Sequence, residues 1–159
     1  GTASPKYHPL KIGTLVKSAL DGVRAEAEAK GVSLSMGTVI EGSLSGDQGQ
    51  LLRVLTNLLG NAIRHTPAGG SVTVSAEQKD GNIALTVRDT GAGIPAAYLE
   101  SIFERFTQVP GATRGGAGLG LSLARSIVQA HGGEIRAESE GEGMGSTFIV
   151  TLPQENSNG

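Results

Sequence analysis

The sequence contains no cysteine and no tryptophan, and aromatic residues make up only 3% of its 159 residues. The absence of cysteine excludes disulfide bonds, thiolate metal sites and cysteine nucleophiles, and it fits a reducing compartment. No apolar run approaches the roughly 20 residues that span a bilayer, and the first residues lack the pattern of a signal peptide. We therefore expect a soluble, cytoplasmic domain, whether or not a parent protein is anchored in a membrane.

An excess of charge is also lacking, since 13 basic residues face 15 acidic ones and leave a formal net charge of −2. Broad electrostatic attraction to nucleic acid or to an anionic membrane is therefore not expected, and any phosphate binding must be local. The length is that of a single domain. We expect this domain at 9–153, with a linker or cloning remnant at 1–8 and a disordered tail at 154–159.

Glycine, in contrast, is abundant. There are 25 glycines, and many of them cluster at 91–93, 115–120, 132–133 and 141–145. Such clustering is unlike low-complexity sequence, in which glycine recurs throughout a segment. It predicts several loops in which the backbone must adopt conformations, or make close approaches, that a side chain would hinder.

The spacing of apolar residues predicts three helices, at about 13–30, 47–65 and 117–131. Asp47 is the expected N-cap of the second helix, because a carboxylate can accept hydrogen bonds from the free N–H groups of the first turn. A shorter helix is expected at 96–103. It lies in an otherwise irregular stretch that is long for a loop in a compact domain, and such loops are usually functional or mobile.

Alternation of apolar and polar residues predicts the strands, two of which are joined by the hairpin signal Asp80-Gly81. The predicted strands are 32–36, 71–77, 83–88, 134–140 and 146–152. Helices and strands thus occur in mixed order along the chain. This order predicts an α/β fold, a two-layer α/β sandwich in which three helices cover one face of a mixed, mainly antiparallel sheet.

The second helix carries a polar face, because Asn57, Asn61 and Arg64 lie within one narrow wedge and His65 lies beside Asn61. The opposite arc is apolar and should pack on the sheet. Asparagine is a poor helix former, so two on one face are costly unless they have a function, although a solvated surface is the simpler alternative. Amide oxygens are hard, neutral ligands of the kind that Mg²⁺ accepts together with substrate phosphates.

Asp89 ends a predicted strand and is followed by Gly91 and Gly93. Glycines at this point allow a flat base to approach the main chain. A carboxylate can accept a hydrogen bond from the exocyclic amine of adenine, whereas guanine presents a carbonyl at that edge and would leave a polar group unpaired. A simple Asp-Gly turn is the alternative interpretation.

A second glycine motif, Gly116-Ala-Gly118-Leu119-Gly120-Leu121, opens the third helix. The N-terminus of a helix presents free N–H groups and favours anions such as the oxygens of a triphosphate. Glycine patterns of this kind also occur in dinucleotide-binding folds, but there they follow the first strand of a parallel unit. Here the motif comes late and follows an irregular stretch, so a dinucleotide fold is disfavoured.

Taken in order, these motifs resemble the ATP-binding catalytic domain of sensor histidine kinases, which belongs to the ATPase group shared with gyrase, Hsp90 and MutL. The resemblance runs from Pro9 to Pro153 and includes Phe103 and Phe106, which resemble the family's F box. It implies a Bergerat-type ATP-binding fold with ATP and Mg²⁺ as ligands. It also implies two-component signalling, in which the γ-phosphoryl group is transferred to a histidine.

The resemblance further implies roles for individual residues. Asn61 is the expected Mg²⁺ ligand, Asn57 lies next to the phosphates, and Asp89 binds the adenine amine. The commonest family pattern has Lys and Tyr where this chain has Arg64 and His65; Arg64 keeps the phosphate-binding charge, while His65 could stack on the base or be a polar helix-end residue. The other nucleotide-site residues implied by the resemblance are Gly91, Gly93, Ile94, Phe103, Arg105, Phe106, Arg114, Gly116, Gly118, Leu119, Gly120, Leu121 and Thr147.

No phosphoacceptor histidine is evident, because His8 lacks an acidic neighbour and helical context, and His131 precedes two glycines at a helix end. The implied partners are therefore ATP or ADP, a separate helical dimerisation and phosphoacceptor domain of the parent kinase and, indirectly, a response regulator. The fragment itself is expected to be monomeric. An anti-sigma-type serine kinase and a catalytically silent docking module with the same fold are the alternatives. The intact motifs favour the histidine kinase.

Overall fold

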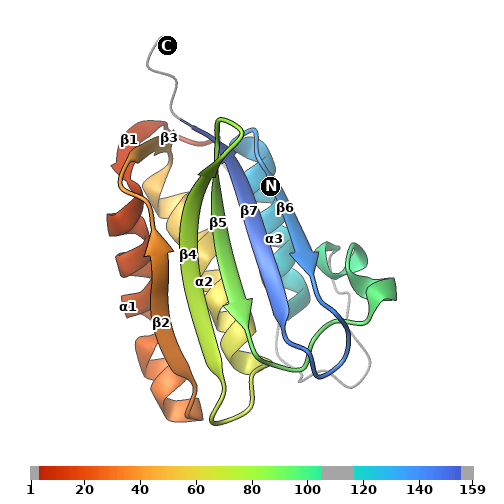
Figure 1. Cartoon of the computed structure of the whole chain (residues 1–159). Coiled ribbons are helices and arrows are strands. Elements are labelled where there is room, and N and C mark those ends of the chain that lie inside the picture. The colour runs from red at the N-terminus through yellow and green to blue at the C-terminus, as the bar shows by residue number, and fades with distance from the viewer. Residues whose placement is uncertain (1–3, 105–116, 155–159) are drawn as a thin grey trace.

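Three α-helices cover one face of a five-stranded sheet in the computed structural model, which describes residues 4–104 and 117–154 (Figure 1). The strand order is β2-β4-β5-β7-β6. Strand β2 runs parallel to β4, and the remaining neighbours are antiparallel. The strands are β2 (Ser33–Val39), β4 (Ser71–Lys79), β5 (Asn82–Asp89), β6 (Glu134–Glu138) and β7 (Ser146–Pro153). The predicted two-layer α/β sandwich is confirmed.

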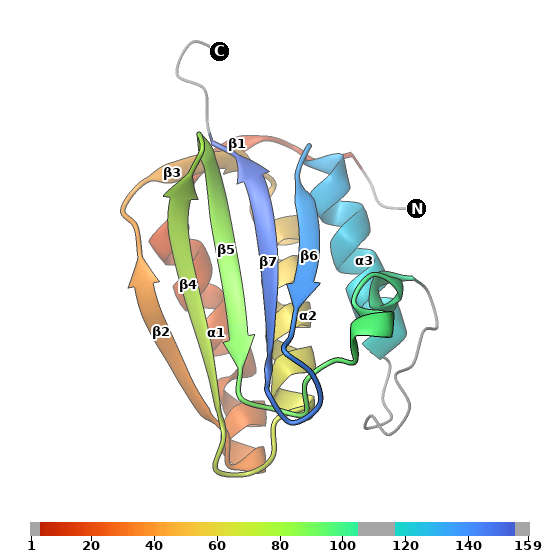
Figure 2. The same cartoon turned by 45° about the vertical axis from the view of Figure 1, so that its right-hand side comes forward.

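The helices are α1 (Ile12–Lys30), α2 (Gln48–Arg64) and α3 (Ala117–Ala130), and Figure 2 shows all three on the same side of the sheet. Helix α2 lies between the other two. Its apolar stripe is fully buried, as the helical spacing predicts, and its members include Leu51, Leu55, Leu58, Leu59, Ala62 and Ile63. Truncating one of the buried leucines to alanine typically costs about 2–5 kcal/mol. The core between helices and sheet therefore fixes the position of α2.

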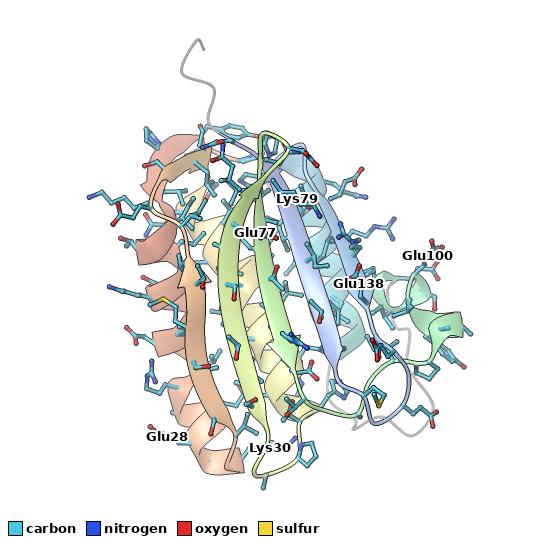
Figure 3. All side chains as sticks on the ribbon, viewed as in Figure 1. Glu28, Lys30, Glu77, Lys79, Glu100 and Glu138 are labelled. Atoms are coloured by element: carbon cyan, nitrogen blue, oxygen red, sulfur yellow. The ribbon has the colours of Figure 1, made fainter. Side chains whose placement is uncertain are left out.

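The helix ends are defined by local signals that the sequence contains. The Asp47 carboxylate accepts a hydrogen bond from the Gln50 N–H at 3.1 Å and caps α2 as predicted. Helix α1 stops at Gly31, whose φ of +78° is the left-handed conformation that favours glycine. The Lys30 ammonium, labelled in Figure 3, donates to the carbonyls of Ile63 and Arg64. It thus joins the end of α1 to the end of α2.

Two short strands were not predicted. Strand β1 (His8–Lys11) pairs antiparallel with β3 (Ser43–Gly46) and forms a separate two-stranded sheet. In a strand of four residues, alternation of apolar and polar residues cannot be distinguished from an irregular segment. Strand β1 also contains Pro9, and proline occurs in edge strands of a sheet but rarely in central ones. His8, which the sequence assigned to a linker, is the first residue of β1.

The predicted helix at 96–103 is instead two 3₁₀ turns, η1 (Ala96–Tyr98) and η2 (Ser101–Phe103). Tyr98 N–H donates to the carbonyl of Pro95 and Glu104 N–H to that of Ser101, which is the i to i+3 pattern of this tighter helix. Within residues 4–104 and 117–154, no helix combines the length and the hydrophobicity needed to span a bilayer.

The residues before β1 contact the ends of two helices. The Lys6 N–H donates to the second oxygen of Asp47 at 3.0 Å, and the Tyr7 hydroxyl donates to the carbonyl of Ala130 at 3.2 Å. The Tyr7 ring meets His131 edge-on, with 5.4 Å between centroids. His131 Nε2 accepts the Asp47 N–H at 3.0 Å, so Nδ1 carries the hydrogen and donates to Ile127. This cluster joins the start of α2 to the end of α3.

We predict that Asp47→Ala lowers the free energy of unfolding by about 1 kcal/mol at pH 7, because the Gln50 N–H loses its cap. Asp47→Asn keeps an acceptor and should cost less. Hydrogen bonds from the backbone of Lys6 and Gln50 hold the pKa of Asp47 below its ordinary value of 3.8. The charge-dependent advantage of the wild type over Asp47→Asn is therefore present above pH 3.8 and lost as the pH falls through the folded-state pKa. Urea unfolding at pH 7 and at pH 3 measures both effects, and equal midpoints for all three proteins at pH 7 would exclude the cap.

Candidate functional site

Several predicted site residues meet at one end of the molecule, the lower end in Figures 1 and 2. Asp89, the last residue of β5, pairs with Ser146, the first residue of β7. The Ala92 N–H donates to the carbonyl of His65 at the end of α2, at 3.0 Å. Residues far apart in the sequence, from the ends of a helix and two strands, therefore surround one region.

The carboxylate of Asp89 is buried, with only 4% of the residue exposed. Oδ1 accepts hydrogen bonds from the N–H groups of Gly91 at 2.8 Å and Ser146 at 3.2 Å. Oδ2 accepts one from the Ser146 hydroxyl at 2.7 Å. The bond to Gly91 is that of an Asp-Gly turn. The structure therefore contains the turn, which does not by itself explain the bonds from Ser146. The carboxylate is nevertheless held in a fixed orientation by Gly91, in the loop that follows β5, and by Ser146, the first residue of β7.

Thr147 does not lie beside Asp89, and its predicted place in the nucleotide site stays a prediction. Side chains alternate between the two faces of a strand, and those of Ser146 and Phe148 are buried on the side of Asp89 and the core. Thr147 therefore lies on the open face of the sheet, opposite Arg88 and Glu138, and Figure 3 shows Glu138 on β6. Ser146, the residue before Thr147, is the one that contacts the carboxylate of Asp89. Counting back from the buried Phe148 could have found it.

The loop of residues 90–94 is packed tightly between two other segments. A Cβ added at Gly91 would overlap the carbonyl of His65, and one added at Gly93 would overlap that of Gly141. Gly93 also has a φ of +75°. From the sequence, we expect these glycines to make room for a base. In the structure they are needed first to make room for other parts of the backbone, while the Ile94 side chain is buried in the core.

Asn61 is buried on α2, with 5% of the residue exposed, so it does not belong to a solvated surface. Its Oδ1 has no hydrogen-bond partner among residues 4–104 and 117–154. A buried acceptor without a donor costs about 1–3 kcal/mol. Asn57, one turn earlier, donates from Nδ2 to the carbonyl of Gly120 in α3 at 3.3 Å. An unpaired amide oxygen is a suitable ligand for a hard cation such as Mg²⁺.

Arg64 is directed toward α1. Its Nη1 lies 3.8 Å from Oε1 of Glu26, and Gly60 leaves room for this approach because a Cβ there would lie 3.3 Å from the same nitrogen. This partly exposed ion pair contributes little stability. The structure thus brings Asn57, Asn61 and Asp89 to one end of the molecule and directs Arg64 to Glu26, so its contact with phosphate stays a prediction.

His65 ends α2 and is half-buried. Burial lowers its pKa below the ordinary value of 6.5; the neighbouring Arg64 charge adds to this decrease, and the Asp89 carboxylate opposes it. The imidazole is therefore neutral at neutral pH. A neutral ring at the edge of the site is compatible with contact to a base.

The remaining predicted residues fall into three groups. Phe103 is buried and meets Phe148 edge-on with 6.0 Å between ring centroids, so it is a core residue, and Leu121 is also buried. Gly118 and Leu119 lie in the first turn of α3, as predicted, and Gly120 contributes the carbonyl that Asn57 binds. Four predicted residues lie outside the part of the chain that the structure describes, namely Arg105, Phe106, Arg114 and Gly116.

Comparison with known families agrees with this geometry. A model of the family described as "Histidine kinase-, DNA gyrase B-, and HSP90-like ATPase" matches residues 46–156. The chain belongs to this ATPase family. The matched range includes α2, Asp89, Ser146 and the glycine motif of α3, so the family assignment covers every element of the site.

The relatives of this ATPase domain are sensor kinases. Sensor protein DivL of Caulobacter vibrioides is 38% identical over 155 residues, which are 97% of this chain and 20% of DivL. Sensor histidine kinase WalK of Bacillus subtilis is 45% identical over 112 residues, which are 67% of this chain and 18% of WalK. The chain thus spans about a fifth of the length of these two relatives.

Solved structures show the same fold for the ATPase domain. The solved chain of the mycobacterial sensor histidine kinase MprB has a TM-score of 0.83 at 29% identity, and the match covers 94% of this chain and 99% of that solved chain. Full-length ShkA in complex with AMPPNP has a TM-score of 0.85 at 29% identity, covering 99% of this chain and 33% of ShkA. The fold is therefore that of histidine kinase catalytic domains, as the resemblance implied.

We predict that Gly93→Ala destabilises the ATPase domain by about 1–3 kcal/mol more than Gly81→Ala. Both glycines have a φ near +75°, so alanine is strained at both. A Cβ at Gly81 meets nothing within 4 Å, whereas one at Gly93 overlaps the backbone of Gly141. Urea unfolding of the two variants measures the cost of this overlap. Equal decreases in the free energy of unfolding would show that the loop around Gly93 is not tightly packed against Gly141.

We also predict a pH dependence that comes from His65. The unfolded chain takes up a proton near the ordinary pKa of 6.5, whereas the folded domain binds it only at lower pH. The free energy of unfolding should therefore decrease as the pH falls below 6.5, until the folded-state pKa is passed. His65→Gln should remove this part of the decrease. Urea titrations at pH 7.5 and 5.5 test it; the same loss in both proteins would contradict the lowered pKa.

Proposed function

We propose that this domain binds Mg-ATP and donates its γ-phosphoryl group to a histidine on a separate helical dimerisation and phosphoacceptor domain of a parent sensor kinase. The observation that carries the proposal is the unpaired, buried Oδ1 of Asn61, which lies on the helix that ends beside the Asp89 carboxylate. One group suits a hard cation and the other suits the amine of a base. Membership in the ATPase family supports the same assignment.

Asp89 would select adenine. Oδ1 already accepts two hydrogen bonds, whereas Oδ2 accepts one, from the Ser146 hydroxyl. Since a carboxylate oxygen can accept two, Oδ2 has room for one further donor. The exocyclic amine of adenine supplies a donor, while guanine offers a carbonyl that the carboxylate repels. Ser146 therefore acts by holding the carboxylate with one acceptor position free.

Asn61 would hold Mg²⁺ through Oδ1, and Asn57 and Arg64 would lie toward the phosphates. When bound, the ion neutralises charge on the transferring phosphoryl group. The protein otherwise contributes positioning, since in this reaction an acceptor nitrogen forms a bond to the γ-phosphorus while the bond to ADP breaks. For Arg64 to reach the phosphates, its guanidinium must leave Glu26.

The acceptor histidine is proposed to belong to another domain. His131 is engaged through both ring nitrogens, with Asp47 and Ile127. His8 lies in β1, paired with Gly46. We propose that the isolated domain is a monomer that acts in the cytoplasm, and that a response regulator receives the phosphoryl group from the acceptor domain.

We predict that the domain binds ATP with an affinity in the range of about 1 μM to 1 mM, and that Asn61→Ala removes the part of the affinity that depends on Mg²⁺. Asp89→Asn should weaken ATP binding about tenfold or more, because a charged acceptor is replaced by an amide. It should also reduce the preference for ATP over GTP. Calorimetric titration of the three proteins with each nucleotide, with and without Mg²⁺, measures these effects.

Ser35→Ala is a suitable control, because it removes one hydroxyl contact, with Thr73, at the open face of the sheet. It should bind like the wild type. No binding of Mg-ATP to the wild type would favour the silent docking module, and unchanged affinity in Asp89→Asn would exclude its adenine role. With γ-labelled ATP the domain alone should acquire negligible label, so efficient self-labelling would contradict the separate acceptor.

A further inference from the structure

The turn between β6 and β7 packs directly against the loop that follows Asp89. The Gly145 N–H donates to the carbonyl of Gly91 at 3.1 Å, and the Gly143 N–H donates to that of Ala92 at 2.6 Å. The third bond is different, because the Ile94 N–H donates to a side chain, the hydroxyl of Ser139, at 3.0 Å. Only this bond depends directly on the identity of a side chain in the turn.

The hydroxyl of Ser139 uses its full hydrogen-bonding capacity. It donates to the carbonyl of Gly145 at 2.7 Å, which is closer than the alternative acceptor on Gly141 at 3.3 Å. Its two lone pairs accept the N–H groups of Ile94 and of Gly141, the latter at 3.2 Å. Since a hydroxyl has one hydrogen and two lone pairs, all three positions are occupied. Ser139 thus ends β6, shapes the turn and holds the neighbouring loop.

The loop after Asp89 and the turn between β6 and β7 are packed so closely that little room is left for movement. A Cβ on Gly93 would overlap the carbonyl of Gly141, and a Cβ on Gly145 would overlap that of Asp89. The loop is therefore held at both ends, at Asp89 by Ser146 and at Ile94 by Ser139. Loss of the Ser139 hydroxyl would leave the Ile94 N–H without this partner, so the Ile94 end of the loop would be held less firmly.

We propose that Ser139 is a positioning residue for the nucleotide, which acts by fixing residues 91–94 beside the carboxylate that binds the base. This inference rests on the proposed binding of ATP. A loop that is already ordered loses less conformational entropy when the ligand binds, so anchoring it raises affinity without any contact between Ser139 and the nucleotide. Sequence patterns did not identify this residue, because it belongs to none of the glycine motifs.

The test compares Ser139→Ala with Ser139→Thr, which restores a hydroxyl, and with the control Ser35→Ala. Calorimetry with Mg-ADP measures binding without turnover. We expect Ser139→Ala to bind Mg-ADP about two- to tenfold more weakly, the range that corresponds to one net hydrogen bond. Amide exchange followed by NMR should show faster exchange at Ile94 in this variant. Ser139→Thr should recover both properties, and Ser35→Ala should change neither.

The outcomes separate this inference from the proposed function. If the wild type binds Mg-ADP and Ser139→Ala binds it equally well, the role of Ser139 is overturned and the function stands. If Ser139→Thr fails to restore affinity, packing and not the hydroxyl is responsible, and the inference is again overturned. No binding by the wild type overturns both proposals. Should Ser139→Ala fail to fold, Ser139→Cys, which keeps the size but accepts hydrogen bonds weakly, must show the weaker binding.

Discussion

The site depends on one buried carboxylate. Asp89 lies at the point where β5 leaves the sheet, and it accepts three hydrogen bonds from Gly91 and Ser146. A buried carboxylate is tolerated only when such donors surround it, so the start of β7 and the turn at Gly91 must both lie within hydrogen-bond distance of Asp89. The same arrangement leaves one acceptor position on Oδ2 for a ligand. Under the proposed function, structural stability and recognition of the base would therefore use the same atoms.

The loop that follows Asp89 is held in place by close backbone packing. The loop of residues 90–94 touches the carbonyl of His65 on one side and the turn around Gly141 on the other. Such contacts are possible only where Cβ atoms are missing, which explains why separate glycine clusters are needed for a single site. Ser139 contributes the side chain that joins two of these clusters.

Helix α2 contributes both to the hydrophobic core and to the candidate site. Its leucines build the core that fixes its position, while Asn61 is buried and its Oδ1 has no partner in the part of the chain that the structure describes. A buried acceptor without a donor destabilises the fold, so folding alone does not explain Asn61. A ligand that binds to its Oδ1 would explain it. Arg64 differs in that its guanidinium has an alternative partner, Glu26, and is free to exchange one anion for another at small cost.

Local signals in the sequence determined the elements of this protein. Helical spacing, the cap at Asp47, the stop at Gly31 and the turn at Asp80-Gly81 each depend on interactions within a few residues, and all four appear in the structure. The resemblance of ordered motifs to a kinase family then indicated the fold, which the comparisons confirmed.

Only the tertiary structure decided which side chains meet. Strand register and contacts between residues distant in sequence bring four pairs together. They are β1 with β3, Ser146 with Asp89, Arg64 with Glu26 and Ser139 with Ile94. A shift of one residue along a strand turns a side chain to the other face. Register is set by the packing of the whole sheet and its helices, whereas a local pattern such as alternation shows only which residues of one strand share a face.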